Sequence, residues 1–131
     1  MKCMLNLIEG LRFVGLSETG HSIVMDTDKK VGGLESAASP MEVMLMGMMG
    51  CTAMDAVSIL AKMKENVSDF TVEAEANRTD EHPRYWKSIH LTFRVYGKNI
   101  HEKNVAKAIQ LSQEKYCGAV NSLRPETEIS T

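Results

Sequence analysis

The feature that most constrains the fold is an uncharged, largely apolar run from residue 43 to residue 54. Helix-start signals stand directly before it. Ser39 suits an N-cap and Pro40 the first helical position, and Glu42 falls three residues after Ser39, which completes a capping box. We therefore predict one long helix that begins at Ser39. A helix that is apolar on every face must be surrounded by protein or by lipid.

The same helix is predicted to stop near Asn66, because Lys62 and Lys64 would then place cations in its last turn. A lipid surrounding is disfavoured, since a spanning helix needs roughly 20 apolar residues and Asp55 interrupts the run before that length is reached. We expect a helix buried in a protein core, and no membrane partner.

One face of this helix carries small residues. Gly47, Gly50, Cys51 and Met54 follow the i, i+3, i+4, i+7 spacing of a helix face. Such a face allows another helix to approach closely. The sequence leaves two partners open, the second helix of this chain or the same helix of a second subunit.

Length, charge and cysteine content limit the class of protein. The sequence has 131 residues and a formal net charge of -2, so we expect a single domain covering residues 1–131. No basic block is present, which argues against nucleic acid as a partner. Three cysteines without a signal-peptide pattern indicate reduced thiols in the cytoplasm. The sequence has no CxxC pair and no local cluster of metal ligands.

The order of the predicted elements is β-rich, helix, β-rich, helix, short strand, which indicates an α+β fold. A polar loop over residues 26–38 leads into the long helix, and Asn99 with Glu102 is predicted to cap the second helix. The strands are predicted at residues 5–8, 11–14, 21–25, 70–77, 89–96 and 127–131. The inner face of the second helix is assigned to Val105, Ala108, Ile109, Ser112 and Tyr116.

The cysteines are the main candidates for chemistry. Cys51 lies in the middle of the long helix and Cys117 at the end of the second. Both fit the description of small buried hydrophobic residues without reactivity. Alternatively the two sulfurs meet when the helices pack, and form a redox pair in which a sulfenic acid is resolved as a disulfide. Sequence spacing does not decide between these interpretations.

The residues around both cysteines resemble a known family. Residues 39–42 (Ser-Pro-Met-Glu) leading to residues 49–52 (Met-Gly-Cys-Thr) look like the central helix of the OsmC/Ohr family, the osmotically induced and organic hydroperoxide resistance proteins. Residues 114–117 (Glu-Lys-Tyr-Cys) resemble its second cysteine motif, and the similarity extends to residues 9–15 and 81–83. Within the family the chain looks closest to the less characterised OsmC-like branch.

The resemblance implies an intertwined homodimer with a long buried central helix, and a thiol peroxidase that reduces organic hydroperoxides. Cys51 would be the peroxidatic cysteine and Cys117 the resolving one. A dithiol, lipoyl-type in the peroxidase branch, would restore the pair, and no metal or organic cofactor is needed. Met44, Met48 and Met54 would provide apolar surroundings for a small apolar hydroperoxide, although core packing explains them equally well.

The family activates its buried cysteine with an arginine from the N-terminal sheet and a glutamate near the helix start. Arg12 is the candidate arginine, and a strand residue facing solvent is the alternative interpretation. The family glutamate follows the proline directly, where this chain has Met41; Glu42 lies one residue later, about 100° around the helix. Asp55 lies on the cysteine's side of the helix, and we interpret it as structural because an anion there opposes thiolate formation.

Three functions remain open. The first is an OsmC-like homodimeric peroxidase that uses Cys51 and Cys117. The second is a dimeric binding or redox-responsive protein with the same fold, which the displaced Glu42 favours. The third is a structural domain with inert thiols, which the motif match disfavours. Cys3 has no assigned role.

Overall fold

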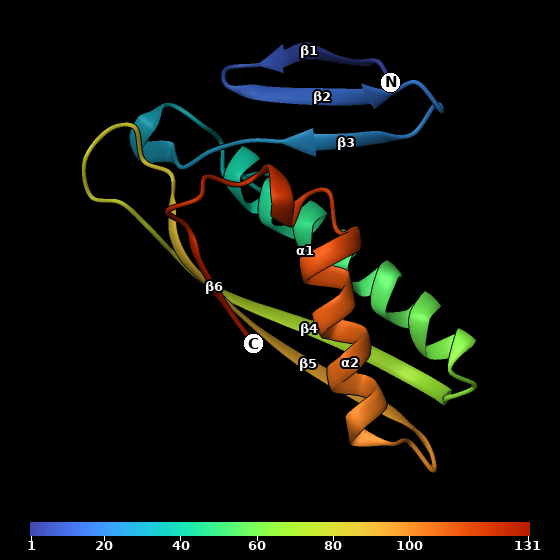
Figure 1. The fold of residues 1–131 in the computed structure, drawn as a ribbon. Coiled ribbons are helices and arrows are strands. Elements are labelled where there is room, and N and C mark those ends of the chain that lie inside the picture. The colour runs from blue at the N-terminus through green and yellow to red at the C-terminus, as the bar shows by residue number, and fades with distance from the viewer. The chain divides into compact units, whose positions relative to one another are not determined.

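The computed structural model describes residues 1–131 and divides into two compact units, Met1–Met46 and Gly47–Thr131. Figure 1 shows the succession of strands and helices along the chain. Helix α1 (Pro40–Lys62) begins in the first unit and continues into the second. Two mainly antiparallel sheets and two substantial helices confirm the predicted α+β class.

The first unit contains a three-stranded antiparallel meander. Its strands are β1 (Cys3–Glu9), β2 (Arg12–Ser17) and β3 (Ser22–Met25), in the order β1-β2-β3. Gly10 has a positive φ of 57° in the turn between β1 and β2, a conformation that glycine adopts without steric cost. The predicted meander is confirmed, with each strand somewhat longer than or shifted from its sequence-based bounds.

The loop after β3 is organised around Asp26, a feature that sequence interpretation missed. Its side chain is 1% exposed, and it accepts hydrogen bonds from the backbone N–H groups of Thr27 (2.8 Å), Leu34 (3.2 Å) and Ser36 (3.0 Å). The Ser36 hydroxyl donates a further bond at 2.7 Å. These donors, the Ser36 hydroxyl first, hold the pKa of Asp26 well below its usual range although burial opposes them. A short 3₁₀ turn, η1 (Lys29–Val31), completes this loop.

Helix α1 begins as predicted. The Ser39 N–H and hydroxyl both donate to the Glu42 carboxylate at 2.7 Å, and the Glu42 N–H donates to Ser39 Oγ at 3.3 Å. This is the reciprocal capping box, and the Ser39 hydroxyl is the main reason that the pKa of Glu42 is lowered.

The predicted end of the helix was wrong by about a turn. The helix ends at Lys62, and Asn66 begins the next strand. Lys64 has a φ of 63°, its N–H donates to the Ala61 carbonyl at 3.0 Å, and the Glu65 N–H donates to the Leu60 carbonyl at 3.0 Å. These two bonds form a Schellman cap with lysine in the left-handed position where glycine is usual.

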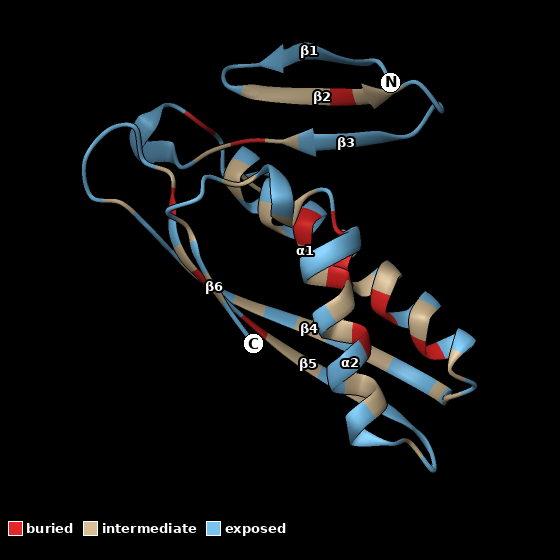
Figure 2. Ribbon diagram, viewed as in Figure 1, coloured by how far each residue is buried: buried red, intermediate tan, exposed pale blue.

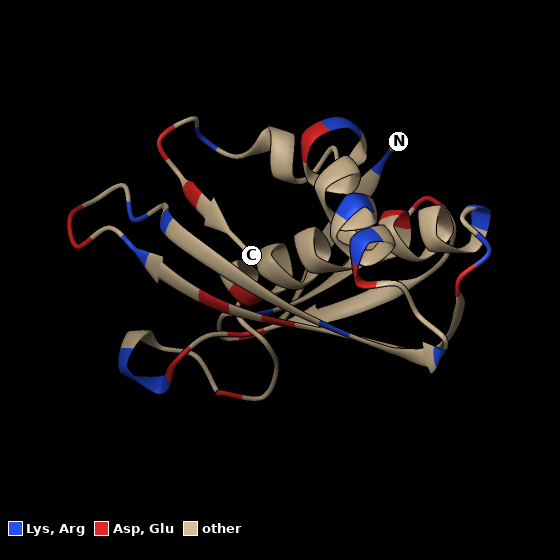
Figure 3. Ribbon diagram, turned by 60° about the horizontal axis from the view of Figure 1, so that its bottom comes forward, with Lys and Arg blue, Asp and Glu red and all other residues tan.

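The second unit contains a long hairpin with a short third strand. Strands β4 (Asn66–Arg78) and β5 (Trp86–Lys98) are antiparallel, and β6 (Glu128–Ser130) runs parallel to β5 at the edge of the sheet. Acidic and basic residues both occur along the hairpin, where Arg94 pairs with Glu73 at 2.7 Å (Figure 3). The predicted alternation of buried and solvated positions is confirmed.

The second helix differs from its prediction at both ends. Helix α2 covers Glu102–Leu111 and its N-cap is His101, whereas Asn99 adopts a φ of 56° in the preceding turn. The chain continues as a π-helical turn, η2 (Ser112–Tyr116), and after it as a 3₁₀ turn, η3 (Val120–Ser122). The wider π turn rotates Tyr116 away from the predicted inner face, so that its side chain is 53% exposed.

The core of the second unit is built on one stripe of α1. The stripe repeats every four residues, and Figure 2 shows further buried positions on α2 and β5. The buried residues of the stripe are Met48, Thr52, Ala56 and Leu60. The buried residues that β5 and the α2 segment contribute are Trp86, Ile89, Leu91, Ala108, Ser112 and Cys117.

The small-residue face of α1 is only partly covered within the chain, since Cys51 on this face is half-buried. A Cβ added at Gly47 or Gly50 would meet nothing within 4 Å, and Met54 is 76% exposed. Helix α1 is long and apolar enough to cross a membrane, but core helices of soluble proteins can have the same length and composition. Only 22% of its most apolar window is buried within the chain. Much of the apolar surface of α1 therefore has no protein partner within the chain.

Candidate thiol site

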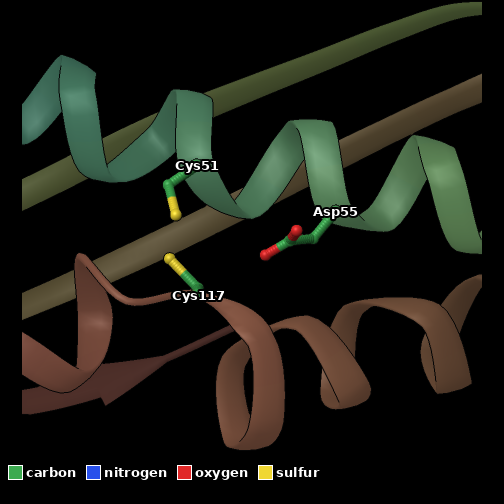
Figure 4. A group of neighbouring side chains, drawn as sticks. All are labelled: Cys51, Asp55 and Cys117. Atoms are coloured by element: carbon green, nitrogen blue, oxygen red, sulfur yellow. The ribbon is translucent and has the colours of Figure 1, made fainter.

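The second unit brings two cysteines and one aspartate together. Cys51 and Asp55 lie one turn apart on α1, and Cys117 directly follows η2. The two sulfurs and a carboxylate oxygen of Asp55 all lie within 4.8 Å of one another. Figure 4 shows the three side chains pointing toward a common point between the two helical segments. Sequence spacing left open whether the two sulfurs meet, and in the structure they lie close together.

The π turn fixes the backbone at Cys117. The Cys117 N–H donates to the Ser112 carbonyl at 2.7 Å, the five-residue spacing of a π-helix. On the other side, the Cys117 carbonyl accepts bonds from the Asn121 N–H at 3.2 Å and from Asn121 Nδ2 at 2.9 Å. Both backbone groups of Cys117 are therefore held in place.

The Cys117 sulfur is enclosed. Its residue is 0% exposed, the Thr52 hydroxyl donates to Sγ at 3.3 Å, and the Val120 N–H donates at 3.4 Å. Sequence interpretation missed both donors. The signal for Thr52 was its place four residues after Met48 in the buried stripe, whereas Val120 carried none.

Cys51 is half-buried and less well supplied with donors. The Ala119 backbone N–H favours its thiolate and lowers the pKa. The hydrogen bond with Cys117, burial, and the negative charges of Cys117 and Asp55 act in the opposite direction and outweigh it. The net result is a raised pKa for the Cys51 thiol. Within the second unit nothing cationic counteracts this.

Asp55 has little hydrogen-bond support. Its one side-chain neighbour of this kind is the Ser112 hydroxyl, 3.4 Å from Oδ2. The same hydroxyl lies 3.1 Å from the Thr52 carbonyl, and it has only one proton to donate. The Thr52 carbonyl and the Asp55 carboxylate therefore share that proton, and Asp55 receives at most one side-chain hydrogen bond. Its proximity to Cys51 opposes the thiolate, as the sequence interpretation expected.

The other predicted site residues belong to the first unit. Arg12 lies on β2, where its guanidinium pairs with Glu9 at 3.5 Å. The Glu42 carboxylate is engaged by Ser39 in the capping box. Their roles toward Cys51 stay predictions.

The three predicted methionines do not form one apolar wall. Met48 is buried, and its carbonyl oxygen lies 4.0 Å from the Cys117 sulfur. Met44 and Met54 are exposed in the chain. Within the second unit Met48 lies beside the Cys117 sulfur, and a role of Met44 and Met54 in binding an apolar substrate stays a prediction.

Comparison with known proteins decides the family. Residues 33–131 match the model of the OsmC-like protein family. The chain belongs to that family. This OsmC-like chain is 39% identical over 130 residues to Protein YhfA of Escherichia coli (strain K12), which covers 99% of this chain and 94% of that protein. The resemblance drawn from the two cysteine motifs is thereby confirmed.

Two solved structures share the fold of this chain. A hypothetical protein from Aquifex aeolicus VF5 is 27% identical, with a TM-score of 0.84 over 98% of this chain and 92% of that one. The organic hydroperoxide resistance protein OsmC from Legionella pneumophila is 14% identical, with a TM-score of 0.73 over 99% of this chain and 94% of that one. The family and its structural neighbours thus include organic hydroperoxide resistance proteins.

Proposed function

We propose that this OsmC-like chain is a thiol-dependent reductase of organic hydroperoxides. The observation that carries the proposal is the presence of the Cys51 and Cys117 sulfurs within 4.8 Å of each other. Their exposure assigns the roles. Cys51 is half-buried and reachable by a substrate, so it is the proposed peroxidatic cysteine. Cys117 is fully buried beside it and is the proposed resolving cysteine.

The reaction proceeds in two steps. The Cys51 thiolate attacks the outer oxygen of the hydroperoxide, which breaks the O–O bond, releases the alcohol and leaves a sulfenic acid on Cys51. The Cys117 sulfur then displaces water from that sulfenic acid and forms a disulfide, with an S–S length of about 2.0 Å. A dithiol, lipoyl-type by analogy with the peroxidase branch, returns both sulfurs to thiols and is itself oxidised to a disulfide.

Activation of Cys51 requires a cation, because the second unit by itself raises the pKa of this thiol. Arg12 is the proposed source, with Glu42 as the residue that orients it. Arg12 suits the role in one respect, since its Nε is buried without a hydrogen-bond partner. The proposal includes an intertwined cytoplasmic homodimer, which the exposed apolar residues of α1 favour.

The test is oxidation by stoichiometric cumene hydroperoxide in the presence of a metal chelator, followed by non-reducing peptide mass spectrometry. We expect a Cys51–Cys117 disulfide within seconds. Cys51→Ser abolishes hydroperoxide consumption, whereas Cys117→Ser leaves one slow turnover and a trappable sulfenic acid on Cys51. Cys3→Ser is the matched control and behaves as wild type, since Cys3 is exposed and belongs to the first unit. Thiols that stay reduced under excess oxidant contradict the proposal.

A second function is supported by the raised pKa of Cys51 and by Met41, which stands where the peroxidase branch has glutamate. Both features favour a dimeric binding or redox-responsive protein of the same fold, whose thiols oxidise slowly and without turnover. The oxidation assay separates the two functions, because this protein forms the disulfide over hours instead of seconds.

A further inference from the structure

We propose that Cys51, Asp55 and Cys117 form a binding site for a zinc ion. All three candidate ligand atoms lie within 4.8 Å of one another. A tetrahedral zinc ion with Zn–S bonds of about 2.3 Å and Zn–O bonds of about 2.0 Å separates its ligand atoms by roughly 3.5 to 4 Å. The side chains therefore reach zinc geometry with small inward movements, along the directions that they already take in Figure 4.

The backbone is arranged for this convergence. Cys51 and Asp55 lie four residues apart on α1, the spacing by which two ligands on one helix reach a single ion. Cys117 approaches from the opposite segment, with its backbone fixed by Ser112 and Asn121. A preorganised site of this kind loses little freedom when the ion binds.

The donor set selects the metal. Two sulfurs and one carboxylate oxygen suit zinc, whereas magnesium and calcium prefer ligand sets made of oxygen alone. Asp55 is available as a ligand because its carboxylate has one side-chain donor, the Ser112 hydroxyl at 3.4 Å, which also reaches the Thr52 carbonyl at 3.1 Å. Three protein ligands leave the fourth position of the tetrahedron to water. This arrangement differs from the expectation that the chain has no metal-ligand cluster, since the cluster forms only in the folded chain.

Zinc at this site has a consequence for the thiols. A sulfur that is bonded to zinc has a lone pair committed to the metal, so zinc and hydroperoxide compete for Cys51. A hydroperoxide that oxidises the bound pair takes two electrons from the Cys51 and Cys117 thiolates and two protons from solvent. It becomes an alcohol and water, and the disulfide that forms releases the ion. The zinc site itself does not depend on the proposed peroxidase activity.

The test is a titration of the reduced, metal-free chain with Zn²⁺ against a metallochromic chelator, without oxidant. We expect one ion per chain. Co²⁺ in place of Zn²⁺ is expected to give a thiolate-to-metal charge-transfer band and the intense visible bands of tetrahedral coordination. Cys51→Ser and Cys117→Ser each keep one sulfur ligand, so we expect about half of the charge-transfer intensity and binding at least tenfold weaker than in wild type. Cys3→Ser is the matched control and retains the full charge-transfer band and the wild-type affinity.

Asp55→Asn tests the carboxylate separately from the sulfurs. It keeps the charge-transfer band of the two sulfurs but binds roughly tenfold more weakly, because one anionic ligand is replaced by a neutral amide. Circular dichroism of each variant establishes that it is folded. Wild-type stoichiometry and affinity in Cys51→Ser or in folded Cys117→Ser overturn the site, as does an unchanged affinity in Asp55→Asn. Failure of the peroxidase leaves this titration unaffected, because no hydroperoxide takes part in it.

Discussion

The two units of the chain are stabilised in different ways. The second unit has an apolar interior that includes Leu60, Ile89 and Leu91, all fully buried. The buried positions of the first unit are Gly15, Gly33 and the charged Asp26, while every residue of β1 is exposed. The second unit therefore has an apolar core of its own, whereas the buried side chain of the first unit is a carboxylate held by hydrogen bonds from the loop after β3.

The two aspartates make this difference concrete. Asp26 accepts hydrogen bonds from the N–H groups of Thr27, Leu34 and Ser36 and from the Ser36 hydroxyl. Asp55 has at most a shared proton from a serine hydroxyl. A carboxylate with a full set of donors holds a loop in one conformation, whereas one with few donors is available to sulfur chemistry or to a metal.

The largest effect is expected from truncating the apolar interior. Leu60→Ala should lower the free energy of unfolding by about 2–5 kcal/mol, because it removes a fully buried side chain and leaves a cavity. Urea denaturation measures this loss. Val57→Ala on the same helix is the matched control, since Val57 is exposed, and should cost less than half as much. Equal losses would contradict the position of the core on the stripe of α1.

The next effect concerns the carboxylate of the first unit. Asp26→Asn should lower Tm by several degrees at neutral pH, because the backbone N–H and hydroxyl donors lose a charged acceptor. Asp55→Asn is the matched control and should leave Tm nearly unchanged. Similar losses in both variants would remove the distinction between the two aspartates.

The same comparison predicts a pH dependence. The folded-state pKa of Asp26 lies well below its unfolded value, so its contribution to stability is complete above about pH 4 and is lost as the pH falls further. Thermal unfolding between neutral pH and about pH 3 measures this loss. The Asp26→Asn variant should show a flatter profile in that range, and a profile parallel to wild type would count against the assignment.

Self-association should follow from the exposed apolar residues of β1. Leu5 and Leu7 are each 60% exposed, and we expect the chain to sediment as a dimer. The double variant Leu5→Glu, Leu7→Glu should shift the equilibrium toward monomer, because it places charges on an apolar strand face. Lys30→Glu, an exposed position outside the strands, is the control. A wild-type chain that stays monomeric would contradict the proposed dimer.

The smallest effect is expected at Asp55. Its negative charge is the weakest of the influences that raise the pKa of Cys51, so Asp55→Asn should move the pH dependence of Cys51 alkylation slightly toward lower pH. Peptide mass spectrometry after timed alkylation, with a chelator present, gives the rates. Asp69→Asn on the exposed part of β4 should leave them unchanged. A shift toward higher pH would mean that the carboxylate does not act on the sulfur as a charge.

Local signals in the sequence predicted a large part of the fold. The capping box of Ser39 and Glu42 and the alternation along the hairpin are short-range patterns, and the structure follows them. The end of α1 was misplaced because Lys64, and not a glycine, adopts the left-handed conformation. The cap of α2 was misplaced because Asn99 uses its tolerance of positive φ in a turn instead.

The candidate site depended on contacts that local patterns do not encode. Nothing near Cys51 in the sequence indicates that Cys117 lies beside it, so the pair was one of two open interpretations until the family resemblance favoured it. Ala119 and Val120 could not be found as donors because they act through backbone N–H groups, whereas Thr52 was missed although its place in the buried stripe of α1 was a signal. The π turn is defined by the backbone hydrogen bond from Cys117 to Ser112, and the amino-acid composition of this segment does not indicate that spacing.

The three thiols differ in burial, so their rates of chemical labelling report local opening of the structure. Cys3 is exposed, Cys51 is half-buried and Cys117 is fully buried, so a bulky alkylating reagent meets them in that order. Labelling of Cys117 requires the segment after α2 to separate from α1, and its rate reports the frequency of that local opening. Comparison of that rate with the rate of global unfolding would show whether the thiol pair separates while the rest of the unit stays folded.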